Sequence, residues 1–181
     1  MSYCQYVNSL KRGEGVHHKA YHKRYGFPMT SDEELFGLLI LEINQAGLSW
    51  DTILKKADNF RKAYNGFSIK KIAAYSSKDK KRLLSDAGII RNHLKIEAAI
   101  HNAKAVLGLQ KQHGSFRNWL GRQGALSRNQ WTELFKKTFY FTGGEIVNEF
   151  LMSSGHLPGA HEKKCKVYKL ALRSGPAWSL K

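Results

Sequence analysis

One acidic side chain on an apolar helix face is the residue of this sequence best placed to do chemistry. Leu35, Leu38 and Leu39 recur at helical spacing. Glu42 occupies the next position of the same stripe, where an unpaired buried charge is costly. Trp50 follows eight residues later, so a carboxylate beside an aromatic wall predicts a site for a flat, hydrogen-bonding or cationic group. A cap on a neighbouring helix, or an ion pair with Lys or Arg, is the alternative role for Glu42.

Cysteine and histidine residues near the two ends of the chain form a second group. Cys4 stands near the N-terminus, and His161 lies four residues before Cys165, one helical turn apart. Two Cys and two His would make a closed tetrahedral zinc site that ties the two ends together. Solvated histidines and two unrelated buried cysteines are the alternative. The candidates for the second histidine ligand are His17, His18 and His22.

The turn 86–90 is a third candidate. Gly88 permits a tight turn, and the N–H groups at the start of the next helix favour an anion. Basic side chains at Arg91 and Lys95 can reach the same phosphate. This combination is typical of a helix-hairpin-helix motif, which grips the DNA backbone without reading sequence. An ordinary corner between two helices is the alternative.

Composition favours one compact domain that meets a polyanion. The 181 residues, 42% of them hydrophobic, suffice for a single domain over 1–181 with a real core, which excludes disorder. A small lobe could form from 1–30 and 145–181. Lys and Arg outnumber Asp and Glu by 30 to 14, and the net charge of +16 favours nucleic acid over a membrane surface. No apolar run reaches the roughly 20 residues of a membrane span, and no signal core follows Met1, so we expect a cytoplasmic protein with reduced cysteines.

Helical periodicity and capping residues predict an all-α domain. Ser31 opens a helix that ends between Glu42 and Gln45, and Ser49 caps the next one. A long amphipathic helix is expected from Asn92 to Leu109, burying Ile96, Ala99, Ile100, Ala103 and Leu107. The remaining signals are Ser68 and Ser77 before short helices, caps at Ser115 and Ser127, and a helix from Gly144 that stops at Gly155.

Motifs along nearly the whole chain resemble, in order, the DNA-3-methyladenine glycosylase I family. The most specific are Gln45–Leu54 and Gly88–Asn92; the others are Cys4-x-Tyr6, Tyr21-His22, Glu42-x-x-Gln45, Gly114-Ser115-Phe116 and His161-x-x-x-Cys165. The resemblance implies a helix-hairpin-helix DNA glycosylase fold with a zinc-stapled N- and C-terminal lobe. It also implies a monomeric, monofunctional enzyme without lyase activity. This enzyme would flip 3-methyladenine out of double-stranded DNA and hydrolyse its glycosidic bond.

The resemblance assigns roles to particular residues. The aromatic rings would stack on the cationic base, and Glu42 would accept hydrogen bonds from its amino edge. Many helix-hairpin-helix glycosylases place an assisting Asp after the hairpin, but no Asp follows Asp86, so Glu42 is the expected functional carboxylate and Glu149 its rival. The implied sets are Tyr21, Trp50, Tyr6 and Tyr25 around the base, Gly88, Ile90, Arg91 and Lys95 on DNA, and Cys4, His22, His161 and Cys165 on zinc.

The sequence departs from the family pattern near the expected pocket. Lys23 and Tyr25 stand where members carry Asp and Trp, and this segment is one residue shorter, which leaves His18 as a competing zinc ligand. Further departures lie at Ile43, Asn44 and Glu149. They favour an altered base preference, or a non-catalytic, zinc-stapled helix-hairpin-helix protein that binds DNA without cleaving it.

Overall fold

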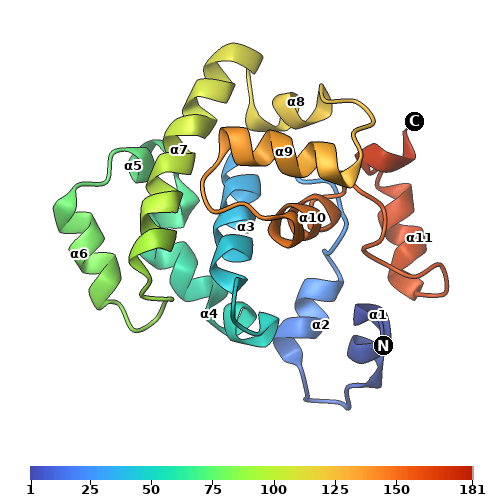
Figure 1. Cartoon of the computed structure of the whole chain (residues 1–181). Coiled ribbons are helices and arrows are strands. Elements are labelled where there is room, and N and C mark those ends of the chain that lie inside the picture. The colour runs from blue at the N-terminus through green and yellow to red at the C-terminus, as the bar shows by residue number, and fades with distance from the viewer. Residues whose placement is uncertain (181) are drawn as a thin grey trace.

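The regular structure of the chain is helical throughout the part described. The computed structural model describes residues 1–180, and these contain helices but no strand (Figure 1). The all-α prediction is therefore confirmed. The helices are α1 (Tyr3–Ser9), α2 (Val16–His22), α3 (Asp32–Gln45), α4 (Trp50–Ala63), α5 (Ile69–Ala73), α6 (Ser77–Ser85), α7 (His93–His113), α8 (Phe116–Gly121), α9 (Arg128–Thr138), α10 (Gly144–Ser153) and α11 (Lys166–Arg173), with short 3-10 turns at Asn65–Phe67 and Ala177–Ser179.

Helix α3 runs through the centre of the molecule and contacts α4, α7, α8 and α10 (Figure 1). It begins where the Ser31 hydroxyl accepts the N–H of Glu34. The motif Ser31-Asp32-Glu33-Glu34 has the form of a capping box, but in the described chain only its Ser31 half is formed; Ser31 Oγ also donates to the carboxylate of Glu33. Every residue from Leu35 to Asn44 is buried, so this helix is apolar on nearly all sides and carries Glu42 inward with it.

Several helix boundaries differ from those expected. Helix α7 continues to His113, and it buries Val106 rather than Leu107 fully. Helix α6 is capped by Ser76, not by Ser77, because Ser76 and Asp79 form a reciprocal capping box. Helices α1, α2 and α11 have at most eight residues each, too short to give a periodic signal in the sequence.

His161 and Cys165 do not share a helical turn, which corrects the expected arrangement. His161 lies in the irregular segment between α10 and α11, and Cys165 is the N-cap residue of α11. Both side chains are nevertheless buried. No helix of residues 1–180 has the length and apolar character needed to cross a membrane.

Asp32 joins the start of α3 to the start of α8. Its Oδ2 accepts hydrogen bonds from Gln110 Nε2 at 2.7 Å and from the N–H of Phe116 at 2.8 Å, and its Oδ1 accepts the N–H of Arg117 at 3.0 Å. One carboxylate thus occupies two of the free amides at the N-terminus of α8 and also faces the positive end of α3.

We expect Asp32→Ala to lower the free energy of unfolding by about 2 kcal/mol, because three charge-assisted hydrogen bonds that join α3, α7 and α8 are lost. Urea unfolding followed by circular dichroism measures this. Glu33→Ala is the matched control, since Glu33 is exposed in the same turn, and its cost should stay below about 1 kcal/mol. Equal losses in the two variants would contradict the bridging role of Asp32.

Candidate functional site

A cavity of about 450 Å³ opens between α1, α2, α3, α4 and α10. Such a volume is within the usual range of small-molecule sites. The cavity contains all the residues expected to surround a base, together with several that were not expected. Its lining consists of Tyr3, Tyr6, His18, Tyr21, Tyr25, Glu42, Gln45, Ser49, Trp50, Asp51 and Glu149.

Glu42 is a buried carboxylate in the wall of this cavity, with 3% of its surface exposed. It accepts a hydrogen bond from Ser153 Oγ at 3.3 Å, and no ion pair of residues 1–180 includes it. Burial, reinforced by the nearby Glu149 carboxylate, raises the pKa of Glu42 to about 8. The predicted burial of Glu42 is therefore confirmed, whereas the alternative of a structural ion pair is wrong within the described chain.

Aromatic rings cover the walls around Glu42. The Tyr21 ring lies edge-on to Trp50, with 5.1 Å between the ring centroids, and 5.3 Å from the ring of Tyr25. Tyr3 closes the group, with its centroid 5.7 Å from that of Tyr25. Flat rings around a carboxylate suit a planar ligand with hydrogen-bonding edges.

Two tyrosine hydroxyls are bound to polar groups of α10. The hydroxyl of Tyr21 lies 2.7 Å from Ser153 Oγ, and that of Tyr25 donates to Glu149 Oε2 at 3.1 Å. Burial raises the pKa of Tyr21 and of Glu149 above their ordinary values. These bonds fix the position of each hydroxyl group, and with it the direction in which each tyrosine side chain points.

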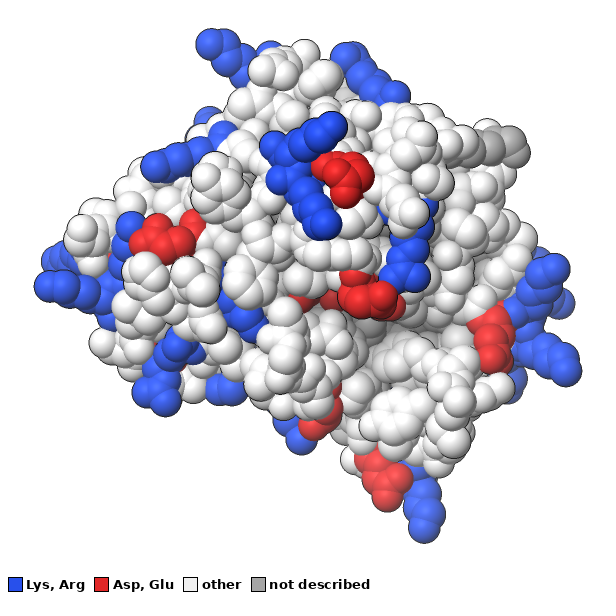
Figure 2. Space-filling view, in the orientation of Figure 1, with Lys and Arg blue, Asp and Glu red and all other residues white. Residues whose placement is uncertain are grey.

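The cavity is acidic although the chain is strongly basic. Three carboxylates, those of Glu42, Asp51 and Glu149, line it, and no Lys or Arg is among its lining residues from the described chain. Figure 2 shows that Lys and Arg are spread over the surrounding surface, with fewer acidic side chains between them. The net charge of +16 thus surrounds a site lined by carboxyl groups, whose ionised forms a bound cation would stabilise.

Sequence reasoning missed part of this lining. Tyr3, His18, Gln45, Ser49 and Asp51 line the cavity without having been assigned to it. Three of them had a local signal, because Gln45, Ser49 and Asp51 belong to the specific motif Gln45–Leu54 that contains Trp50. Glu149, expected as a rival of Glu42, shares the same cavity. Ser153, which holds Glu42, gave no signal at all.

Four buried side chains from both ends of the chain meet beside this cavity. The ligand atoms of Cys4, His22, His161 and Cys165 all lie within 4.8 Å of one another. Cys4 Sγ is 3.4 Å from His22 Nε2 and 3.4 Å from His161 Nδ1. Cys165 Sγ is 3.6 Å and 3.9 Å from the same nitrogen atoms. Such a buried Cys₂His₂ group could bind a metal ion.

The histidines of this group are oriented for metal binding. His161 Nε2 bonds the carbonyl oxygen of Tyr25 at 2.7 Å, which leaves Nδ1 free to face the two sulfur atoms. His18 lies outside the group: its Nδ1 bonds the Tyr3 hydroxyl at 3.1 Å. The structure therefore brings His22, and not its competitor His18, to the cysteines.

The turn 86–90 packs on α4, and its glycine serves a close approach. A Cβ at Gly88 would lie 2.9 Å from Asp86 Oδ1 and 3.2 Å from Asn59 Cβ. The Gly88 N–H is already bound to Asp86 Oδ1 at 2.7 Å, so this amide does not face outward as expected. Within residues 1–180, the N–H groups of Ile90 and Arg91 donate to no partner. The N–H of Ala87 has no partner among these residues either, and Ile90 and Arg91 are the free donors that lie nearest to the start of α7.

Lys95 has a different role from the one expected. Its side chain is buried, and Nζ donates to the carbonyl oxygens of Asn44 at 3.0 Å and Ala46 at 2.7 Å. A cation is favourable there because the last carbonyls of α3 have no partner within the helix. The ammonium group thus holds the end of α3 and is not presented to a phosphate, whereas Arg91 is exposed.

Comparison with known proteins shows which family this chain resembles. The family model of methyladenine glycosylase matches residues 13–133, more than half of the chain. The chain is similar to DNA-3-methyladenine glycosylase 1 of Escherichia coli (strain K12), at 45% identity over 98 residues, 54% of this chain and 52% of that protein. It is also similar to the DNA-3-methyladenine glycosylase of Haemophilus influenzae, at 40% identity over 101 residues, 55% of each chain.

These matches span about half the length of the two curated relatives. A structure of 3-methyladenine DNA glycosylase I from Staphylococcus aureus superposes with a TM-score of 0.78 at 30% identity, covering 85% of this chain and 92% of that one. The resemblance found in the sequence is confirmed: the chain belongs to the methyladenine glycosylase family.

Proposed function

We propose that this protein is a DNA glycosylase that removes 3-methyladenine from alkylated double-stranded DNA by hydrolysis, after flipping the base into the cavity. The observation that carries this proposal is an acidic, aromatic-walled cavity in a chain of net charge +16. The basic surface suits the DNA backbone, while the cavity suits a planar cation. The names of the relatives and of the superposed structure support the same activity.

The chemistry demanded by this substrate fits the residues of the cavity. A 3-methylated adenine in DNA carries a positive charge, and its glycosidic bond is already weak. The protein must therefore extrude the base and distinguish it from neutral adenine rather than supply strong acid catalysis. Tyr21 and Trp50 offer stacking surfaces, and Glu42 offers a hydrogen-bond acceptor whose ionised form the cation would stabilise. A monofunctional reaction is proposed because the described lining of the cavity includes no Lys, so no amine is placed to attack the sugar as a lyase requires.

We further propose that the Cys₂His₂ group binds one structural zinc ion. In a zinc tetrahedron with Zn–S of about 2.3 Å and Zn–N of about 2.1 Å, sulfur and nitrogen lie about 3.6 Å apart. The four measured sulfur–nitrogen distances, 3.4 to 3.9 Å, bracket this value. The ion would join Cys4 on α1 to Cys165 at the start of α11 and would take no part in bond cleavage, because four protein ligands leave no open position.

We propose that the turn 86–90 binds a DNA phosphate near the lesion. The free N–H groups of Ile90 and Arg91 precede the 21-residue helix α7, whose dipole favours an anion at this end. The exposed Arg91 side chain can add a charged contact. The structure supports Ile90 and Arg91 in this role better than Lys95, and Gly88 acts by allowing the turn to pack on α4.

We expect Glu42→Gln to slow base release from methylated duplex DNA roughly a hundredfold in single turnovers, because an acceptor that becomes charged in the complex is lost. Affinity for undamaged duplex should change less than twofold. Equal rates of release in wild type and variant would contradict the role of Glu42. A wild-type protein that binds DNA but releases no base would instead support the non-catalytic alternative.

The same variant should be more stable than the wild type, with a defined dependence on pH. Between its ordinary pKa of 4.5 and its native pKa of about 8, Glu42 is ionised in the unfolded chain but keeps its proton when folded. Wild-type stability therefore falls as pH rises through this window, by about 1.4 kcal/mol per pKa unit, and Glu42→Gln lacks this loss. Urea unfolding at pH 5 and pH 8 measures it, and Glu133→Gln, at an exposed site, is the control.

We expect about one zinc ion per chain by elemental analysis. His22→Ala and Cys165→Ser should lose the metal together with several degrees of melting temperature, because the two ends of the chain are released. His18→Ala should retain the metal. Zinc lost from the His18 variant but kept in the His22 variant would overturn this assignment of ligands.

We expect Gly88→Val to weaken binding to every duplex alike, roughly tenfold, because the new side chain displaces a turn that contacts only backbone. Fluorescence anisotropy on undamaged and methylated duplexes measures this, and affinity for both should fall steeply with salt. Gly108→Ala is the matched control, because a Cβ at this position of α7 has no atom within 4 Å. A loss confined to methylated DNA would show that the turn is not the phosphate site.

A further inference from the structure

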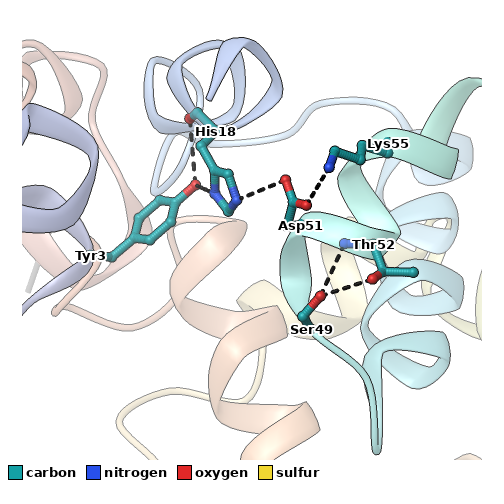
Figure 3. A network of polar contacts seen from close by, with 6 residues as sticks. All are labelled: Tyr3, His18, Ser49, Asp51, Thr52 and Lys55. Carbon is teal, nitrogen blue, oxygen red and sulfur yellow. Dashed lines mark hydrogen bonds and ion pairs between the residues drawn. The ribbon is translucent and has the colours of Figure 1, made fainter. Parts of the chain in front are cut away.

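A chain of polar contacts links three helices at the edge of the cavity. The Tyr3 hydroxyl lies 3.1 Å from His18 Nδ1, and His18 Nε2 lies 3.4 Å from Asp51 Oδ1 (Figure 3). The other oxygen of Asp51 pairs with Lys55 Nζ at 2.7 Å. Tyr3, His18 and Asp51 come from α1, α2 and α4, and all three line the cavity that holds Glu42.

His18, Asp51 and Glu42 differ in their access to solvent. The His18 side chain is 6% exposed and that of Asp51 is 41% exposed, whereas Glu42 is buried. Asp51 therefore marks the mouth of the cavity and Glu42 its interior. Under the proposed function, on which this inference rests, the base enters the cavity while its deoxyribose stays joined to the DNA backbone. The glycosidic carbon must then lie at the mouth, on the side of Asp51.

The ring of His18 is buried, but one of its two nitrogen atoms lacks a well-aligned hydrogen bond. His18 Nε2 is buried and has no hydrogen-bond partner with good geometry, although it faces Asp51 Oδ1. A buried polar atom without a partner is unfavourable, and such atoms in native proteins commonly mark functional sites. A small movement of the Asp51 carboxylate would complete the bond. The carboxylate is thus held from outside by Lys55 and approached from inside by His18.

We propose that Asp51 binds the water that attacks the sugar and faces the positive charge developing there, and that His18, supported by Tyr3, positions this carboxylate. Asp51 would be the catalytic residue, and His18 and Tyr3 positioning residues. No Asp follows Asp86 in the sequence, and this assignment places an Asp at the site from the first turn of α4 instead.

The step balances without any further reactant. The bond between C1′ and N9 breaks, and its electron pair neutralises the cationic purine, which leaves as free base. The water oxygen bonds to C1′, and one water proton passes to Asp51 Oδ1 and then to solvent. Because the leaving group is already cationic, the water needs orientation and a nearby negative charge more than a strong base. Lys55 does not prevent this role, since it occupies the other oxygen of the carboxylate.

The test compares Asp51→Asn with Asp58→Asn. Both changes remove one negative charge from α4, but Asp58 is exposed and does not line this cavity. We expect Asp51→Asn to release 3-methyladenine from methylated duplex 10- to 100-fold more slowly in single turnovers. Its affinity for undamaged duplex should be unchanged, and Asp58→Asn should match the wild type. Equal rates in both variants and the wild type would overturn the proposal, whereas a wild type without base release would overturn the proposed function itself.

Competition between water and methanol as the attacking nucleophile tests whether His18 positions Asp51 or only stabilises the fold. In buffers that contain methanol, water and methanol compete to attack C1′. The wild type should give mainly the abasic sugar with a hydroxyl group at C1′, because Asp51 holds a water molecule in the attacking position. His18→Leu and Asp51→Asn should give O-methyl product in proportion to methanol concentration. His18→Gln, whose amide keeps one donor and one acceptor, should restore much of the selectivity. Variants that lose thermal stability but keep the wild-type product ratio would show that the chain of contacts is structural only.

Discussion

The burial of one carboxylate on a central helix constrains much of the surrounding structure. Helix α3 is enclosed by its neighbours, so Glu42 faces the cavity from a position that it cannot leave for solvent. No cation of residues 1–180 neutralises it, and only Ser153 bonds it. The acidic character of the cavity, the high pKa of Glu42 and the rigid tyrosines around it all follow from this arrangement. The buried carboxyl group of Glu42 lowers the stability of the free protein, and a bound cation would offset this loss.

The same helix is held at both ends by charges of the appropriate sign. Asp32 sits at its N-terminus and also binds the start of α8, while Lys95 binds the carbonyls at its C-terminus. Each charge complements the helix dipole and satisfies groups that α3 cannot pair internally. Because Lys95 lies in the first turn of α7, the phosphate-binding turn that we propose and the helix that carries Glu42 are tied together directly.

Local signals in the sequence predicted the features that depend on neighbouring residues. The caps at Ser31, Ser49 and Ser115 and the burial of Glu42 follow from short-range spacing, and the structure contains them. Contacts across long separations could not be predicted in this way. Lys95 resembled a phosphate ligand because its actual partners lie 49 and 51 residues away, and Ser153 is separated from its partner Glu42 by 111 residues. Short helices near the ends depend on tertiary contacts, so they too gave no signal.

Helix α4 connects two surfaces that otherwise share no element. Trp50 at its first position forms a wall of the cavity, while Lys56 donates to the carbonyl of Ala87 and Asn59 packs against Gly88. From Trp50 to Asn59 a helix rises about 14 Å, and this span is fixed by backbone hydrogen bonds. The helix therefore fixes the distance between the turn 86–90 and the cavity. A duplex held at the turn would then present its nucleotides to the cavity at one set distance from the bound phosphate.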